Sequence, residues 1–205
     1  AKIREIFIER NYIPSASHIK LVDISPRIFS TTNYDTLVEG ALIENSGHNS
    51  FTQHEHTRDG LLDSVRSPST ILIKMHGCAK HPANTILSRS DYFNLRKKHR
   101  SFFELTSSLY KLNTVLFIGC GIEDPDINLI LENNNIEIDT TNPSYAMVGA
   151  KSYAAKIKET IKSQYNIELI IYDQVDEHDH SNFERKLDEL KNKVDLIRTK
   201  FGLTK

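Results

Sequence analysis

The alternation of short apolar runs with helical segments constrains the fold of this chain more than any other feature of its sequence. Runs rich in β-branched and aromatic residues are followed by turn residues and then by helical periodicity. Strands that are apolar without polar alternation are buried on both faces, and strands that alternate with helices form parallel sheets. The sequence therefore predicts a three-layer α/β fold, with helices on both faces of a parallel sheet of about five or more strands. The predicted strands are residues 27–31, 70–75, 115–118, 145–148 and 167–171.

The predicted helices lie between these strands, and two of them carry start signals. Asp124 is placed to cap a helix that has Pro125 at its first position, where a proline is well tolerated. Ser181 and Glu184 have the spacing of a capping box at the start of the last helix. Helices are predicted over residues 2–10, 35–44, 90–110 with a break near 98–100, 125–133, 152–164 and from 181 onward.

Two regions depart from the alternation. Residues 1–25 are predicted to be a helical and irregular lead-in, broken by Pro14, that is the remnant of an upstream part. Residues 45–69 are rich in Gly, Ser, His, Thr and Asp, and this composition predicts a long polar surface loop. The sequence therefore predicts one α/β domain over residues 26–200, with that loop inserted in it.

The charge and hydropathy of the chain exclude several classes of protein. With 26 basic and 27 acidic residues, the formal net charge is −1, so no overall basic field exists to hold nucleic acid or an anionic membrane. The longest apolar runs have about six residues, whereas a membrane-spanning helix needs about 20. Two cysteines, Cys78 and Cys120, cannot form a disulfide framework and indicate a reduced, cytoplasmic setting. We expect neither a membrane nor a nucleic acid as a partner of this domain.

Chemically versatile residues gather where the predicted strands end, which is where parallel sheets bind their ligands. Asn33 and Asp35 follow the first strand, and His76 follows the second. Gly119 and Gly121 follow the third. Each feature also has an ordinary structural explanation: an Asx turn for the first two residues, a hydrogen-bonded strand end for the histidine and a tight turn for the glycines. The glycine pair lacks the third glycine of a dinucleotide-binding fingerprint.

Three segments, in this order along the chain, resemble one known family. They read Ser-Thr-Thr-Asn-Tyr-Asp at residues 30–35, Lys-Met-His-Gly at 74–77, and Phe-Ile-Gly-Cys-Gly at 117–121, which leads into Asp-Pro-Asp at 124–126. The chain is similar to the sirtuin superfamily, and more narrowly to its sirtuin-like NAD-hydrolase branch found in bacterial antiviral defence. The resemblance implies a Rossmann-like domain that takes NAD+ as its substrate.

The resemblance implies an NAD+ hydrolase that cleaves the nicotinamide–ribose bond to give nicotinamide and ADP-ribose, as an antiphage effector that depletes NAD. Asn33 would position the ribose or the attacking water, His76 would be a general base or bind a ribose hydroxyl, and Asp35 would hold the loop or contact the nicotinamide end. The resemblance also implies a homo-oligomer controlled by a sensor or regulatory domain or protein. The residues implied to contact NAD+ are Thr31, Thr32, Tyr34, Gly77, Gly119, Cys120, Gly121 and Asp124.

The sequence departs from the sirtuin pattern in two ways. No glycine precedes Asn33, whereas sirtuins carry a glycine-rich phosphate loop upstream of this position. Together with a first residue that is Ala1 rather than Met, this leads us to expect either a piece of a longer protein or a divergent, inactive relative. Cys-x-x-Cys pairs are absent, so no zinc is expected, and NAD+ hydrolysis is favoured over NAD-dependent protein deacylation. The alternative function is a non-catalytic NAD- or ADP-ribose-binding or interaction module.

The polar segment contains a possible metal motif of its own. His54 and His56 form a His-x-His pair, and His48 lies nearby, which is an arrangement that zinc or nickel can use. Only Glu55 is available to complete it, and long polar segments collect histidines by chance. We therefore assign no metal site.

Overall fold

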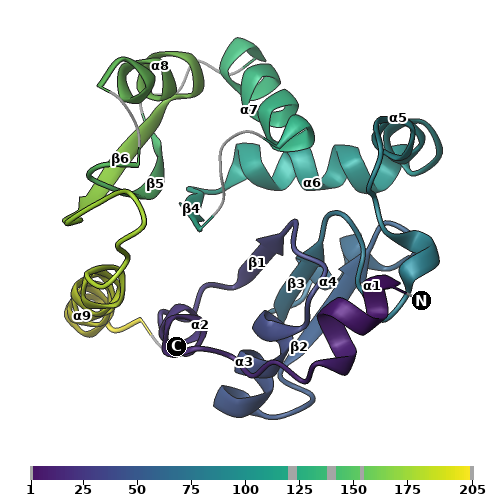
Figure 1. Cartoon of the computed structure of the whole chain (residues 1–205), viewed down its shortest axis with the longest axis horizontal. Helices are drawn as coiled ribbons and strands as arrows, with labels where there is room; N and C mark the ends of the chain where they lie inside the picture. The colour runs from purple at the N-terminus through teal and green to yellow at the C-terminus, as the bar shows by residue number, and fades with distance from the viewer. Residues whose placement is uncertain (1, 120–123, 138–141, 153–154, 204–205) are drawn as a thin grey trace. The chain divides into compact units, whose positions relative to one another are not determined.

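The chain folds into two units, and each is built around its own three-stranded sheet. The structure is a computed structural model that describes residues 2–119, 124–137, 142–152 and 155–203. Unit 1 comprises Ala1–Phe103 and Leu187–Lys205, and unit 2 comprises Glu104–Lys186. In Figure 1 the strands of unit 1 are purple to blue, and those of unit 2 are teal to green. The predicted domain over residues 26–200 stays a prediction.

The sheet of unit 1 has the order β1-β3-β2, and both pairs of strands are parallel. Its strands are β1 (Ile28–Thr31), β2 (Phe51–Glu55) and β3 (Thr70–Lys74). The central strand, β3, is buried along most of its length, as expected for an apolar run without polar alternation. In the register, Lys74 pairs with Thr31 on one side and with Glu55 on the other. The carboxyl ends of the three strands are therefore level.

The prediction of a long polar loop over residues 45–69 is wrong. The segment contains strand β2 and helix α4 (Leu61–Arg66). Its polar residues are part of the packed structure: His54 is buried, and its Nε2 lies 2.8 Å from Oγ of Ser64 on the helix. Polar composition concealed the strand, because buried polar groups are tolerated where they have hydrogen-bond partners.

The helices of unit 1 confirm most expectations for this half of the chain. The predicted helix over residues 2–10 is present as α1 and η1, and the predicted break near residues 98–100 separates α5 from α6. The expected irregular stretch before Pro26 is partly wrong, because it holds a helix that begins with a capping box at Ser15. The bounds are α1 Lys2–Arg4, η1 Glu5–Glu9, α2 Ala16–Asp23, α3 Leu37–Ser46, η2 Pro82–Asn84, α5 Arg89–Lys98, α6 Arg100–Leu112, which continues into unit 2, and α9 Phe183–Phe201, which starts there.

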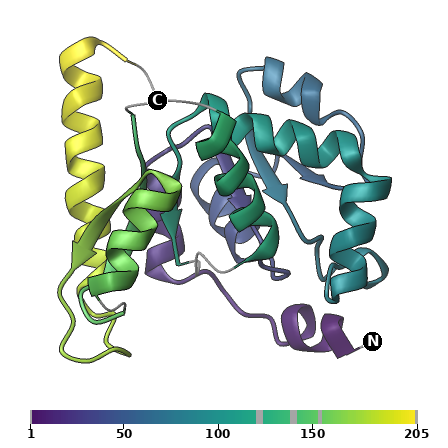
Figure 2. The same ribbon diagram turned by 90° about the horizontal axis from the view of Figure 1, so that it is seen from above.

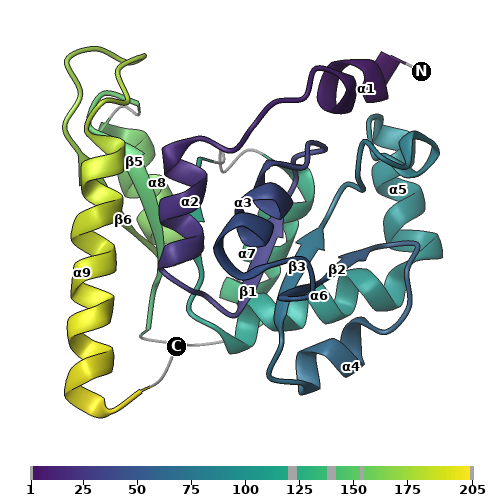
Figure 3. The same cartoon turned by 90° about the horizontal axis from the view of Figure 1, so that it is seen from below.

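Helices α2 and α3 pack on one face of the sheet of unit 1. Val22 of α2 and Leu42 of α3 share an apolar cluster with Leu72 of β3. Helix α9 lies beside α2 (Figure 3). There the Lys20 ammonium lies 2.5 Å from the Asp188 carboxylate. The first and last parts of the described chain therefore both contribute to unit 1.

Unit 2 contains a second parallel sheet, with the order β4-β5-β6. Its strands are β4 (Leu116–Ile118), β5 (Ser144–Gly149) and β6 (Ile167–Tyr172), and its helices include α7 (Pro125–Glu137) and α8 (Ala155–Tyr165). Figure 2 shows α7 and α8 beside these strands. The core consists of Phe117, Ile127, Leu131, Ala146, Val148, Ile161 and Ile167.

The predicted fold class is confirmed as a mixed α/β structure with parallel strands. Each of the five predicted strands is present within a residue or two of its expected bounds, and β2 is an additional strand. The prediction of a single sheet of five or more strands stays a prediction, since the described residues form two sheets of three strands. Among those residues, no helix combines the length and the apolar character needed to cross a bilayer.

Candidate functional site

The candidate site of unit 1 lies at the carboxyl edge of strands β1 and β3. The two strands are neighbours in the sheet, and the Met75 N–H donates to the Thr31 carbonyl at 2.9 Å just beyond the last strand pair. The segment that carries Asn33 follows β1, and His76 follows β3. The predicted amide and imidazole therefore leave the sheet from adjacent strands at the same edge.

Hydrogen bonds hold the segment between β1 and α3, which we call the Asn33 loop (residues 32–36). The Asn33 N–H donates to Oγ1 of Thr31 at 3.1 Å. The backbone carbonyl of Tyr34 accepts from the Ala79 N–H at 2.8 Å. The side-chain hydroxyl of Tyr34 donates to the Ile86 carbonyl at 2.5 Å. The backbone of this loop is thereby attached to the segment that follows β3.

The side chain of Asn33 is exposed. Within the described residues its amide has no hydrogen-bond partner, so both its donor and its acceptor are available to a ligand. Asp35 differs, because its Oδ1 accepts from the Leu37 N–H at 3.0 Å at the start of α3. The Asx turn considered for both residues is therefore present at Asp35, which leaves Asn33 as the better candidate for ligand contact.

His76 lies in the turn after β3 and is 3% exposed. Its ring meets the ring of Tyr92 edge-on, with centroids 5.0 Å apart, and its carbonyl accepts from the Ile86 N–H at 3.0 Å. The next residue, Gly77, has φ +80°, and a Cβ there would lie 2.6 Å from the carbonyl oxygen of Asn84. A glycine is required at this turn for a steric reason, so backbone geometry alone accounts for it.

A buried ion pair beneath the Asn33 loop was not predicted from the sequence. Lys74, the last residue of β3, is fully buried, and its Nζ lies 3.2 Å from Oε1 of Glu39 on α3. The same ammonium donates to the backbone carbonyl of Asp35. Burial raises the pKa of Glu39, and the charge of Lys74 acts in the opposite direction. A lysine at the end of the apolar run 70–75 was the one available signal.

A second polar group lies at the carboxyl end of strand β2, where Glu55 pairs with Lys74 of β3. Oε1 of Glu55 lies 3.1 Å from Nδ1 of His81, whereas its Oε2 has no hydrogen-bond partner among the described residues. His56 packs edge-on against His99, with ring centroids 4.8 Å apart. Burial lowers the pKa of His56, and the neighbouring His99 adds to that effect. In the described part of the chain, no three His, Cys, Asp or Glu side chains are arranged to hold a metal ion.

The predicted residues of unit 2 follow strand β4. Gly119 has φ +61°, a conformation that favours glycine. Oδ1 of Asp124 accepts from the N–H groups of Asp126 and Ile127 at 3.0 and 3.2 Å, so the predicted helix cap of α7 is confirmed. Cys120 and Gly121 lie outside the described residues.

The loop after strand β6 contains a residue that the sequence analysis did not include in the site. Gln174 is 8% exposed, and its Oε1 accepts from the Lys151 N–H at 2.9 Å. Its Nε2 donates to the Asp179 carbonyl at 2.8 Å. A Cβ on Gly149 would lie 2.0 Å from this amide. The absence of a side chain at position 149 thus makes room for the glutamine that ties two loops together.

Comparison with known proteins identifies the family of this chain. A family model described as SIR2-like domain matches residues 27–170. The chain belongs to the SIR2-like domain family. The match begins just before β1 and ends within β6, so it includes the described strands of both units, and the sirtuin resemblance of the three segments is confirmed.

The SIR2-like domain is also similar to curated bacterial proteins. It is 26% identical over 165 residues to "NAD(+) hydrolase ThsA" of Acinetobacter baumannii (strain 532279), covering 80% of this chain and 33% of that protein. It is 30% identical over 115 residues to "NAD(+) hydrolase ThsA" of Bacillus cereus (strain MSX-D12), covering 56% and 24%. It is 28% identical over 118 residues to "Defense-associated sirtuin 2" of Bacillus subtilis, covering 56% and 11%. The chain thus aligns with a third or less of each relative.

Proposed function

We propose that this SIR2-like domain is the catalytic portion of an NAD+ hydrolase that releases nicotinamide and ADP-ribose in antiviral (antiphage) defence. The observation that carries the proposal is the placement of Asn33 and His76 after adjacent parallel strands, with the Asn33 amide exposed and without a partner among the described residues. Relatives whose names state this activity support it.

The proposed chemistry uses an amide and an imidazole at one ribose. Cleavage of the nicotinamide–ribose bond builds positive charge on the ribose, and nicotinamide is already a good leaving group. Asn33 orients the attacking water or the ribose without adding charge. His76 accepts a proton from a ribose hydroxyl or from the water. Asp35 keeps the loop in place through its bond to the Leu37 N–H.

The remaining NAD+ contacts are proposed on the residues that the sirtuin resemblance selects. NAD+ is the substrate, and the site uses no zinc. The protein is a cytoplasmic homo-oligomer, and a sensor or regulatory domain or protein controls its activity. We further propose a Rossmann-like parallel sheet of about five or more strands with helices on both faces. The proposed contacts are Thr31, Thr32, Tyr34, Gly77, Gly119, Cys120, Gly121 and Asp124.

Two substitutions in the intact protein test this function. Asn33→Ala and His76→Ala are each expected to lower the rate of nicotinamide release by at least about 100-fold, since each removes a group that acts on the reacting ribose. His48→Ala and Asn49→Ala are matched controls at exposed positions and should keep the wild-type rate. Nicotinamide is quantified by chromatography, and thermal unfolding monitors the fold. Wild-type turnover in both test variants would contradict the assignment.

The alternative function is a non-catalytic binding or interaction module. A module of this kind would bind NAD+ or ADP-ribose as a signal. Calorimetry with NAD+ beside the nicotinamide assay separates the two functions. Binding without turnover by the intact protein would favour the signal-binding module, and turnover would exclude it.

A further inference from the structure

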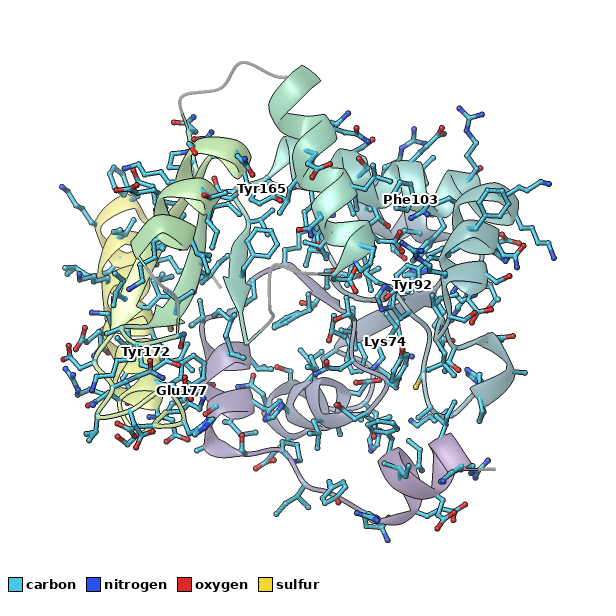
Figure 4. The ribbon with its side chains drawn as sticks, turned by 45° about the horizontal axis from the view of Figure 1, so that its top comes forward. Lys74, Tyr92, Phe103, Tyr165, Tyr172 and Glu177 are labelled. Carbon is cyan, nitrogen blue, oxygen red and sulfur yellow. The ribbon has the colours of Figure 1, made fainter. Side chains whose placement is uncertain are left out.

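From the structure we infer that Lys74 and Glu39 are positioning residues, which fix the Asn33 loop relative to His76. This inference rests on the proposed function. Lys74 is the hub of the arrangement, because its one ammonium contacts both the carbonyl of Asp35 and the carboxylate of Glu39. Figure 4 shows Lys74 inside unit 1. Neither residue touches the reacting atoms, so both act through the loop.

The burial of this pair argues for a task other than stability. The side chains of Lys74 and Glu39 are 1% and 4% exposed, so both charges have lost their hydration. Replacing such a pair with apolar residues is often neutral or stabilising. The three preceding residues of β3, Ile71–Ile73, are buried and apolar, and an apolar residue at position 74 would continue that run. The charge at this position is therefore better explained by the hydrogen bond that its ammonium donates to the Asp35 carbonyl.

One hydrogen bond of the Lys74 ammonium holds the far end of the Asn33 loop. At the near end, the Thr31 carbonyl accepts from the Met75 N–H. At the far end, the Asp35 carbonyl accepts from the ammonium of Lys74. Asn33 lies between these two attachments, and both come from the end of β3 that leads into His76. The segment that carries the imidazole thus also anchors the loop that carries the amide.

Glu39 orients the ammonium. It lies in the first turn of α3, directly after the loop that Lys74 holds. An ammonium has three donors on a flexible stem, and a carboxylate at 3.2 Å limits the directions in which it can point. Without Glu39, the buried ammonium would lack its counter-charge. The two residues therefore act together: Lys74 holds the loop, and Glu39 orients the ammonium of Lys74.

A double substitution separates positioning from stability. Lys74→Met leaves the Glu39 carboxylate buried without its cation and should lower the melting temperature. Lys74→Met combined with Glu39→Leu removes both charges and should restore most of that loss. Turnover should not return: kcat for nicotinamide release is expected to stay at least about 30-fold below wild type, with KM changed less than about threefold. Recovery of kcat together with stability would overturn the inference.

Hydrogen exchange tests the positioning without reference to activity. Amides of residues 32–36 should exchange at least about tenfold faster in the double variant than in wild type, because the loop has lost its far attachment. Unchanged exchange would overturn the inference even if wild type is active. If wild type releases no nicotinamide but exchange rises as expected, the positioning device stands and the proposed function falls.

A matched control uses an ion pair on the surface. Nζ of Lys162 lies 3.8 Å from Oε1 of Glu168, and both side chains are at least half exposed. Lys162→Met combined with Glu168→Gln should leave melting temperature, kcat and loop exchange at wild-type values, because exposed pairs contribute little. A loss of kcat in this control equal to that in the Lys74 and Glu39 variant would also contradict the inference, since the effect would not depend on the Asn33 loop.

Discussion

Unit 1 and unit 2 each use a buried polar side chain to hold the loop after a strand, but the two side chains differ in charge. In unit 1 the holder is Lys74, which needs Glu39 as a counter-charge. In unit 2 the holder is Gln174, a neutral amide whose oxygen and nitrogen both bond to loop groups. A buried charge is costly once its partner is removed, whereas a neutral amide loses only hydrogen bonds. The charged holder should therefore be the less tolerant of substitution.

Removal of each holder tests that difference most strongly. Lys74→Met is expected to lower the free energy of unfolding by about 3–5 kcal/mol, since it leaves Glu39 as an uncompensated buried charge. Gln174→Met is expected to cost about 1–3 kcal/mol, since its partners become unsatisfied but none of them is ionised. Urea denaturation measures both values. An equal or larger loss for Gln174→Met would break the comparison.

Substitution of one glycine in each unit is expected to have the next largest effect on stability. Gly77→Ala places a Cβ 2.6 Å from the backbone oxygen of Asn84 at φ +80°, and we expect a loss of about 2–4 kcal/mol in the free energy of unfolding. Gly149→Ala meets only the end of the Gln174 side chain, which can rotate away at a cost of about 1–3 kcal/mol. Thermal unfolding ranks the two variants. The reverse order would show that the Gln174 network is the more rigid of the two.

The smallest expected effect is a loss of stability at low pH, and its source is Asp179 in unit 2. Backbone hydrogen bonds from Val175 and Ser181 lower the pKa of Asp179 to about 2. A carboxylate with a lowered pKa stabilises the fold above its ordinary pKa, and this contribution is lost as the pH falls from about 4 to about 2. Asp179→Asn should therefore reduce the dependence of the melting temperature on pH over that range. An unchanged slope in the variant would exclude Asp179 as its source.

The sequence was informative where a residue's role depends on its neighbours along the chain. The apolar runs predicted strands β1, β3, β4, β5 and β6, and the local pattern of Asp124 and Pro125 predicted the cap of α7. The order of the strands then placed Asn33 and His76 at one edge. These inferences need only periodicity and the rule that parallel strands share a carboxyl edge.

The sequence was misleading where burial contradicts composition. Strand β2 reads as polar because it contains Gln53 and His54, yet its last two residues are buried. Lys74 and Gln174 are side-chain types that usually lie at the surface, so neither was predicted as part of a site. Their partners are 35 and 23 residues away, at Glu39 and Lys151. Such long-range pairing cannot be read from local patterns.

The most direct test of the account is a crystal structure of the intact protein with ADP-ribose. We predict that the ribose that carried nicotinamide lies within about 3.2 Å of both the Asn33 amide and the His76 imidazole. A ribose bound elsewhere, or in contact with only one of these side chains, would contradict the claim that the two act together on the same bond.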